Sequence, residues 1–259
     1  YLHRRQRQMC IRDSTSPVTG MTVDLENITK EVRNVTPDCI IIVDGIQHSS
    51  HGAIDVQKYD IDGYVVSPYK MFSRHGYGVA WASERLCALN KEQLADGPFQ
   101  NWELGTRDAG SYATFSDVVD YLDWLGSNFT ESENTRERLE ASSIAIKSHE
   151  QELVDLVING AEDLVGLRNN KKIRIIGNSA STSREGVVSF FHKNKPSRII
   201  VEELRQRKIR VHIRKDDHYC GNILRPLNQK DCIRFSICHY NSKAEVVEFM
   251  KAINEISTN

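Results

Sequence analysis

Residues 39–70 read CIIIVDGIQHSSHGAIDVQKYDIDGYVVSPYK, and this stretch decides the predicted fold. It opens with a continuous apolar run that ends at Asp44 and Gly45, and a second apolar run follows at 64–66. Continuous runs of this kind are typical of strands covered on both faces, as in parallel sheets. A third strand is expected at GVAWAS (78–83). The stretch therefore predicts a mainly parallel sheet.

The remainder of the chain alternates between helix and strand patterns. The first part is expected to form helices at 25–32, 84–94 and 111–126, with Gly126 as a stop signal. A long helix at 135–158 leads into a second unit. That unit is expected to hold strands at 172–177, 186–192, 209–214 and 232–239 and helices at 197–208 and 243–256. The alternation predicts the α/β class, with a large domain over 15–130 and a small α/β (α+β) domain over 131–259.

Residues 1–14 (YLHRRQRQMCIRDS) differ in composition from the rest of the chain. Arginines crowd this stretch, but the apolar core of about 7–15 residues that a signal peptide requires does not follow them. A basic arm that binds nucleic acid is one interpretation. The stretch also resembles translated adapter sequence, so we interpret it as a non-native leader. No element is predicted there, and the native protein is expected to begin further upstream.

Composition narrows the class of protein. The formal net charge of −1 gives no overall field that would attract nucleic acid or an anionic membrane. No apolar run approaches the roughly 20 residues that span a bilayer. The six cysteines are scattered and form no CxxC pair, and His48, His51 and His75 show no metal-ligand spacing. We therefore expect a soluble cytoplasmic protein with reduced thiols, no metal site, and neither a nucleic-acid nor a membrane partner.

Three polar residues follow the ends of the first two predicted strands. Asp44 closes the first strand, Gln47 comes shortly after it, and Lys70 follows the second strand. Ligands of open α/β sheets bind beyond the carboxyl ends of the strands. A lysine there can form a Schiff base with pyridoxal 5′-phosphate, and an aspartate can pair with the pyridinium nitrogen. The alternative is that the Asp-Gly pair is only a turn and the lysine is solvated.

The segment VDGIQHSSHGAIDVQKYDIDGYVVSPYK (43–70) resembles the class V aminotransferase-fold enzymes that use pyridoxal phosphate, which include cysteine desulfurases and selenocysteine lyases. The resemblance continues through GYGVAWAS (76–83), NWELGTRDAGSYATFSDVVDYLDWLG (101–126) and CIRFSICHYNSKAEVVEFMKAI (232–253). It implies part of a fold type I large domain, a complete small domain and a homodimer. The family's N-terminal half is expected to be missing, so this chain is expected not to hold the cofactor tightly.

The resemblance also implies cofactor-binding roles. Asp44 would pair with the pyridine nitrogen and Gln47 would bond the phenolic oxygen. Lys70 would hold the Schiff base and later move the Cα proton. Ser67 would contact the phosphate, and Tyr69 stands where the family often has a histidine that assists phosphate binding.

Two further roles come from the resemblance alone. Thr106, after Gly105, would reach the phosphate in the partner subunit of the dimer. Arg234 would clamp the α-carboxylate of the amino-acid substrate, because a guanidinium offers two parallel donors to a carboxylate.

The reaction type depends on RKDDHYCGN (214–222). In cysteine desulfurases a loop histidine precedes the cysteine that carries persulfide, and Cys220 lies near that place. Its acidic neighbours would raise the pKa of a thiol, so a free loop thiol is the alternative. The sequence thus leaves open a cysteine desulfurase or lyase, an aminotransferase or epimerase, and an inactive fragment or interaction module.

Overall fold

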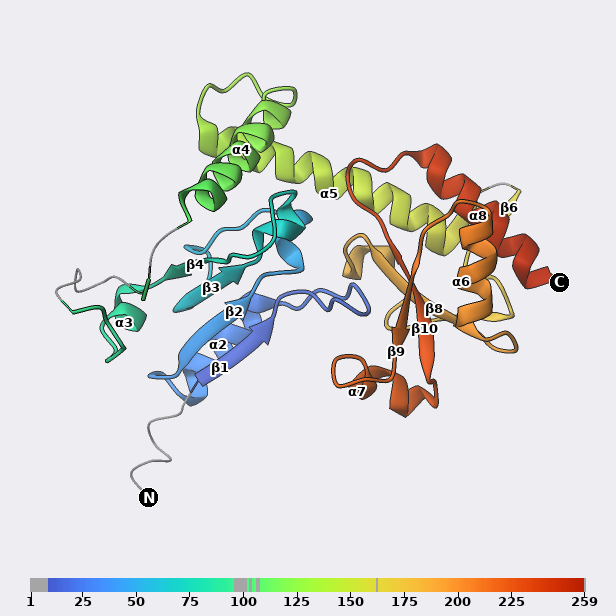
Figure 1. The fold of residues 1–259 in the computed structure, drawn as a ribbon, viewed down its shortest axis with the longest axis horizontal. Helices are drawn as coiled ribbons and strands as arrows, with labels where there is room; N and C mark the ends of the chain where they lie inside the picture. Colours follow the sequence, from blue (N-terminus) through green and yellow to red (C-terminus); the bar gives the residue numbers. More distant parts are fainter. Residues whose placement is uncertain (1–8, 96–101, 103, 106–107, 162, 259) are drawn as a thin grey trace. The chain divides into compact units, whose positions relative to one another are not determined.

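The computed structural model describes residues 9–95, 102, 104–105, 108–161 and 163–258 (Figure 1). The chain divides into two compact units. The first comprises the chain up to Ser14 and residues 23–143, and the second comprises Thr15–Thr22 and the chain from Ile144. The sequence placed the division at 130/131 and assigned 15–22 to the first domain. The boundary between residues 143 and 144 falls inside helix α5 (Thr135–Asn159), which runs from the first unit into the second without a break.

The first unit is built on a four-stranded sheet in the order β1-β2-β3-β4. The strands are β1 (Met9–Asp13), β2 (Ile40–Asp44), β3 (Gly63–Val66) and β4 (Val79–Ala82). Strands β1, β2 and β3 run parallel, and only the β3–β4 pair is antiparallel. The predicted mainly parallel sheet is therefore confirmed.

Strand β1 lies inside the stretch for which no element was predicted. It pairs with β2 over its full length, from Met9 opposite Ile40 to Asp13 opposite Asp44. The arginine-rich composition gave no strand signal, so this element was missed. The pairing rests on backbone groups, which any residue can supply.

Helices α2 (Leu25–Val35), α3 (Glu84–Cys87) and α4 (Ala109–Gly126) complete the first unit with two short 3₁₀ turns, η1 (His48–Ser50) and η2 (Pro68–Met71). Asp24 caps α2 by accepting from the Asn27 N–H at 3.1 Å. The helix predicted at 84–94 ends at Cys87, which corrects that prediction. Beyond it Leu89 and Leu94 are 46% and 45% exposed, so apolar burial gives a longer helix little support.

The second unit contains a four-stranded antiparallel sheet in the order β7-β8-β10-β9. The strands are β7 (Ile173–Ile175), β8 (Val187–His192), β9 (His212–Lys215) and β10 (Asp231–Ser236). Helices α6 (Ser197–Gln206) and α8 (Lys243–Thr258) lie beside one another against this sheet (Figure 1). The unit also holds the hairpin β5 (Gly160–Ala161) and β6 (Leu164–Val165), the short helix α7 (Gly221–Leu224) and the 3₁₀ turns η3 (Ser181–Ser183) and η4 (Arg225–Leu227), none of which was predicted.

Strand β8 of the second unit's sheet is buried on both faces. Neighbouring residues on a strand point to opposite faces, and Phe190 and Phe191 accordingly join different apolar clusters. On the helix-covered face Phe235 stacks on Phe249 with ring centroids 3.9 Å apart. On the opposite face Phe191 packs in a cluster with Val18, which comes from segment 15–22. This segment therefore completes the core of the second unit.

Candidate active site

The carboxyl ends of β2 and β3 meet at one edge of the first unit's sheet. The parallel register sets Asp44 opposite Val65, two residues before Ser67. Gly45 then turns the chain tightly past Tyr64, because a Cβ atom at this glycine would lie 2.2 Å from the tyrosine ring. The glycine of the Asp-Gly pair is thus required by a close contact.

The structure brings Lys70 and Gln47 together. Lys70 lies in η2, which starts after Ser67 with Pro68 in its first turn. The Lys70 Nζ donates to Gln47 Oε1 at 3.0 Å, although the two residues are 23 positions apart. The Gln47 Nε2 lies 3.2 Å from Nε2 of His51, which is only 4% exposed. One amide therefore links the lysine amine to a buried imidazole.

Asp44 is half-buried, and hydrogen bonds hold both its side chain and its backbone. Its Oδ1 accepts from the Ile46 N–H at 3.0 Å, which orients the carboxylate. Its backbone carbonyl accepts from the N–H of Ser14 at 3.0 Å and from the Ser14 hydroxyl at 3.2 Å. Asp44, Gln47 and Lys70 therefore occupy one edge of the sheet, as the sequence predicted for the strand ends.

The residues beside Lys70 form an unusual backbone and an aromatic pair. Tyr69 is 41% exposed, and its ring stacks on His75 with centroids 4.3 Å apart. Phe72, which ends η2, has φ 69°, a left-handed conformation that is uncommon for a bulky residue. Such conformations persist where the surrounding structure imposes them and are frequent near active sites.

Helix α4 begins close to the lysine loop. Its cap Asp108 accepts from Arg74 at 2.7 Å and from the Ser111 hydroxyl at 2.7 Å. The Ser111 bond and the nearby Arg74 lower the pKa of the Asp108 carboxyl. In addition, the Ser73 hydroxyl donates to Thr114 at 3.0 Å. These contacts fix the chain after Lys70 against α4. Thr106 itself lies outside the described residues.

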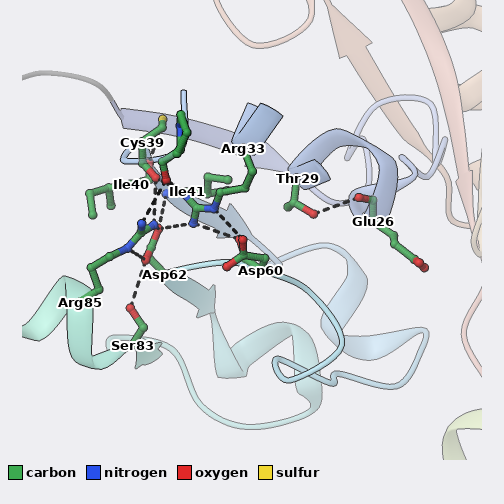
Figure 2. A network of polar contacts seen from close by, with 11 residues as sticks. Glu26, Thr29, Arg33, Cys39, Ile40, Ile41, Asp60, Asp62, Ser83 and Arg85 are labelled. Atoms are coloured by element: carbon green, nitrogen blue, oxygen red, sulfur yellow. Dashed lines mark hydrogen bonds and ion pairs between the residues drawn. The ribbon is translucent and has the colours of Figure 1, made fainter. Parts of the chain in front are cut away.

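The opposite end of the same sheet holds a buried ion network that the sequence did not suggest (Figure 2). Asp62 is 2% exposed and accepts from Arg85 at 2.6 and 2.7 Å and from Arg33 at 2.9 Å. It also accepts from the Ile41 N–H at 2.8 Å. Burial alone would raise the pKa of Asp62, but these donors outweigh it and lower the pKa to about 2. Both arginines also donate to the Cys39 carbonyl, so the network ties the amino-terminal ends of β2 and β3 together.

Arg234 belongs to the second unit. It lies on β10 opposite Ser189 of β8, and its Nη1 donates to the Pro17 carbonyl at 2.9 Å. The guanidinium is thus oriented by segment 15–22.

Comparisons with known proteins identify the family of the chain. The family described as "Aminotransferase class-V" matches residues 3–249 of the chain. The chain belongs to the class-V aminotransferase family. Class-V aminotransferases and cysteine desulfurases are enzymes that depend on pyridoxal phosphate.

Relatives of this class-V aminotransferase chain include the cysteine desulfurase of Synechococcus elongatus, which is 26% identical over 234 residues. The match covers 84% of this chain and 33% of that protein. The aminotransferase-like protein FGM3 of Gibberella zeae is 27% identical over 250 residues, with 93% and 57% covered. The chain therefore spans about a third of the length of the first of these two relatives and less than three-fifths of the second.

Solved structures show the same fold. The cysteine desulfurase of Thermococcus onnurineus superposes with a TM-score of 0.76 at 19% identity, over 97% of this chain and 60% of that one. The cysteine desulfurase CsdA of Escherichia coli gives a TM-score of 0.73 at 21% identity, over 95% and 58%. The α/β class predicted from the sequence is therefore confirmed.

Cys220 of this class-V aminotransferase chain has the surroundings of a core residue. It lies in the turn that precedes α7, is 0% exposed and packs with Leu224 and Cys232. Burial raises the pKa of its thiol, and the nearby Asp217 carboxylate adds to the rise. The same carboxylate accepts from the Cys220 N–H at 2.9 Å. A nucleophilic thiol needs a low pKa and access, and this environment provides neither.

Two more observations bear on the class of protein. Cys39, Cys87, Cys220, Cys232 and Cys238 are free thiols. Within the part of the chain that the structure describes, no helix is both long and apolar enough to span a membrane.

Proposed function

We propose that this chain carries the lysine side of an active site that binds pyridoxal 5′-phosphate and acts on an amino acid. The observation that carries the proposal is the bond between Lys70 Nζ and Gln47 Oε1 at 3.0 Å, at the strand edge where β2 ends in Asp44. An amine, an amide and a carboxylate at one sheet edge are the donor set that this cofactor requires. The residues present therefore fit the group.

Each residue has a defined task in this proposal. Asp44 would hold a proton on the pyridine nitrogen, since a fixed carboxylate favours the charged ring. Gln47 would bond the phenolic oxygen, and Ser67 the phosphate. When bound, the cofactor supplies a cationic ring that takes up the electron pair released at the substrate Cα. Lys70 would provide the amine that binds the aldehyde carbon and would afterwards move the Cα proton.

The substrate and the assembly belong to the same proposal. Arg234 would bind the α-carboxylate of the amino acid, for which its paired donors are suited. We also propose a cytoplasmic homodimer in which Thr106 reaches the partner's cofactor phosphate. The names of several relatives support a reaction of the cysteine desulfurase or lyase type.

An aminotransferase or epimerase reaction is the second candidate, and one observation favours it. Cys220 is 0% exposed and the pKa of its thiol is raised, and both properties disfavour it as the nucleophile that persulfide formation needs. Sulfide release from cysteine, compared in the parent protein and Cys220→Ala, separates the two. Release that is lost in the variant supports the desulfurase route through this thiol. If alanine or cysteine is instead transaminated or racemised without sulfide, the second candidate stands.

Chemical trapping tests the cofactor site even when binding is weak. The chain is mixed with pyridoxal phosphate, reduced with borohydride and digested, and the modified lysine is located by mass spectrometry. We expect the label to concentrate on Lys70 and to disappear in Lys70→Arg. Lys58→Arg is the matched control, because Lys58 is exposed in the same unit and should leave the label unchanged. If Lys70 carries no more label than the exposed lysines do, the proposal is contradicted.

A further inference from the structure

Segment 15–22 is attached to the rest of the second unit through its backbone carbonyls. The carbonyls of four successive residues, Pro17 to Gly20, each accept a hydrogen bond from a donor of the second unit. The donors are Arg234 Nη1 to Pro17, the Ser189 hydroxyl to Val18, Arg184 Nη1 to Thr19 and the Glu185 N–H to Gly20. Arg234 and Ser189 are opposite one another on β10 and β8, so they hold neighbouring carbonyls.

Arg184 is the most heavily buried of the charged donors in this set. It is 3% exposed, and its hydrogen-bond partners in the described part of the chain are backbone carbonyls and the Met21 sulfur. Its Nη1 reaches Thr19 at 3.1 Å and Val187 at 3.4 Å, and its Nη2 reaches Ile176 at 3.4 Å and also Asn178. One guanidinium therefore ties segment 15–22 to two other stretches of the unit.

Burying a cation against carbonyl groups, without a carboxylate partner, costs free energy because the charge loses its hydration. Burial lowers the pKa of Arg184 to about 10, which still leaves the side chain charged at neutral pH. Apolar residues usually fill such a position at lower cost. The guanidinium has one property that they lack, since its five N–H donors lie in a fixed plane and can orient several carbonyls at once.

We propose that Arg184 is a positioning residue for Arg234. By fixing the backbone of 17–20, Arg184 places the Pro17 carbonyl where it holds the Arg234 guanidinium in one orientation. The inference rests on the proposed role of Arg234 in binding the substrate carboxylate. It deepens that role by naming the residue that prepares the guanidinium before substrate arrives.

Amide hydrogen exchange tests the structural half of the inference in this chain. The N–H groups of Gly20 and Thr22 are bonded to Ser16 and Ser183, so their exchange reports on the order of the segment. We expect exchange in 15–22 to become about tenfold faster in Arg184→Met and also in Arg184→Lys, which keeps the charge but loses the planar donors. Arg205→Met is the matched control, because the Arg205 side chain is 75% exposed and pairs with Glu202. Unchanged exchange in Arg184→Met overturns the inference.

Kinetics of the cofactor-loaded protein test the functional half. An amino acid is compared with the amine that lacks its carboxylate. We expect Arg184→Met to raise KM for the amino acid about tenfold, to leave kcat unchanged, and to leave the amine unaffected. The change should add little in an Arg234→Lys background, because both variants act on the same guanidinium. Equal losses for amino acid and amine, or additive effects in the double variant, indicate a merely structural role and overturn the proposal.

The two proposals can fail separately. If Arg234→Lys does not alter the preference for the amino acid over the amine, the carboxylate role of Arg234 is wrong and the proposed function loses that residue. If exchange in 15–22 is faster in Arg184→Met but the preference for the amino acid is unaltered in Arg234→Lys, the structural half of the inference stands. The failure then lies in the role of Arg234.

Discussion

At the residue scale, Gln47 decides how Lys70 is presented. Its amide bonds the lysine amine at 3.0 Å and lies 3.2 Å from buried His51. We expect Gln47→Ala to reduce borohydride-trapped label on Lys70 by about fivefold to tenfold, since one hydrogen bond contributes about 1 kcal/mol. Gln57→Ala is the control, because Gln57 is exposed and should leave labelling unchanged. Full labelling in Gln47→Ala at the parent rate contradicts this role.

The buried carboxylate of Asp62 leads to a prediction about how the stability of the fold depends on pH. Its folded-state pKa of about 2 lies below the ordinary aspartate pKa of 3.8, so the carboxylate stabilises the fold above about pH 4. That contribution, about 2 kcal/mol, should be lost as pH falls from about 4 to 2. Urea unfolding between pH 6 and pH 2 measures it.

Asp62→Asn separates this carboxylate from the general acid response. The variant should be about 3 kcal/mol less stable at neutral pH, because Arg33 and Arg85 lose their buried counter-charge. The difference from the parent should shrink toward pH 2. A constant difference across the whole pH range is the result that opposes the assignment.

The candidate site was partly predictable at the residue scale. Asp44, Gln47 and Lys70 follow strand ends, and parallel strands bring such positions to one edge. Cys220 was not predictable in the same way. Its burial depends on Val18 and Cys232, which are distant in sequence, and a local pattern carries no information on such packing. Asp62 was missed because its two arginine partners lie 29 and 23 residues away.

At the element scale, the turn from β2 into η1 depends on Gly45. A Cβ atom there would lie 2.2 Å from the Tyr64 ring, and Tyr64 is 5% exposed and cannot move aside freely. We expect Gly45→Ala to lower the free energy of unfolding by about 1–3 kcal/mol, as overpacked cores do. Gly78→Ala is the control, because its Cβ would meet only the Val66 carbonyl at 3.7 Å. Equal urea midpoints for the two variants argue against the close contact.

Elements with strong local patterns were predicted well, and those without them were not. The apolar run at 40–44 and the striped helix at 109–126 appear close to their expected bounds. The two-residue strands β5 and β6 are too short to show a period. Helix α3 stops at Cys87 because a helical pattern becomes a stable helix only where another element covers its apolar face.

At the scale of the whole molecule, the division into units does not follow the order of the chain. Segment 15–22 stands between β1 and α2 of the first unit but completes the core of the second. The sequence could not indicate this, because the segment is held mainly through carbonyl groups that every residue possesses. Side-chain patterns predict which face of an element is buried, and they say little about contacts made by the backbone.

The discontinuous second unit leads to a prediction about dissection. A fragment of residues 135–258 keeps all of α5 but lacks Val18, which is 3% exposed in the intact chain. Without 15–22, the free energy of unfolding of the fragment should be about 2–4 kcal/mol lower than that of the second unit with the segment in place. The loss comes from reduced apolar burial and from hydrogen-bond donors that no longer have their carbonyl partners. A synthetic peptide of residues 13–24 added in excess should restore part of that stability, measured as a rise in the thermal midpoint. The same peptide with Gly20→Val should fail, since Gly20 has φ +75° and a Cβ there would lie 2.3 Å from the Val187 carbonyl. If both peptides raise the midpoint equally, or neither does, the segment does not belong to the second unit in the way its carbonyl contacts indicate.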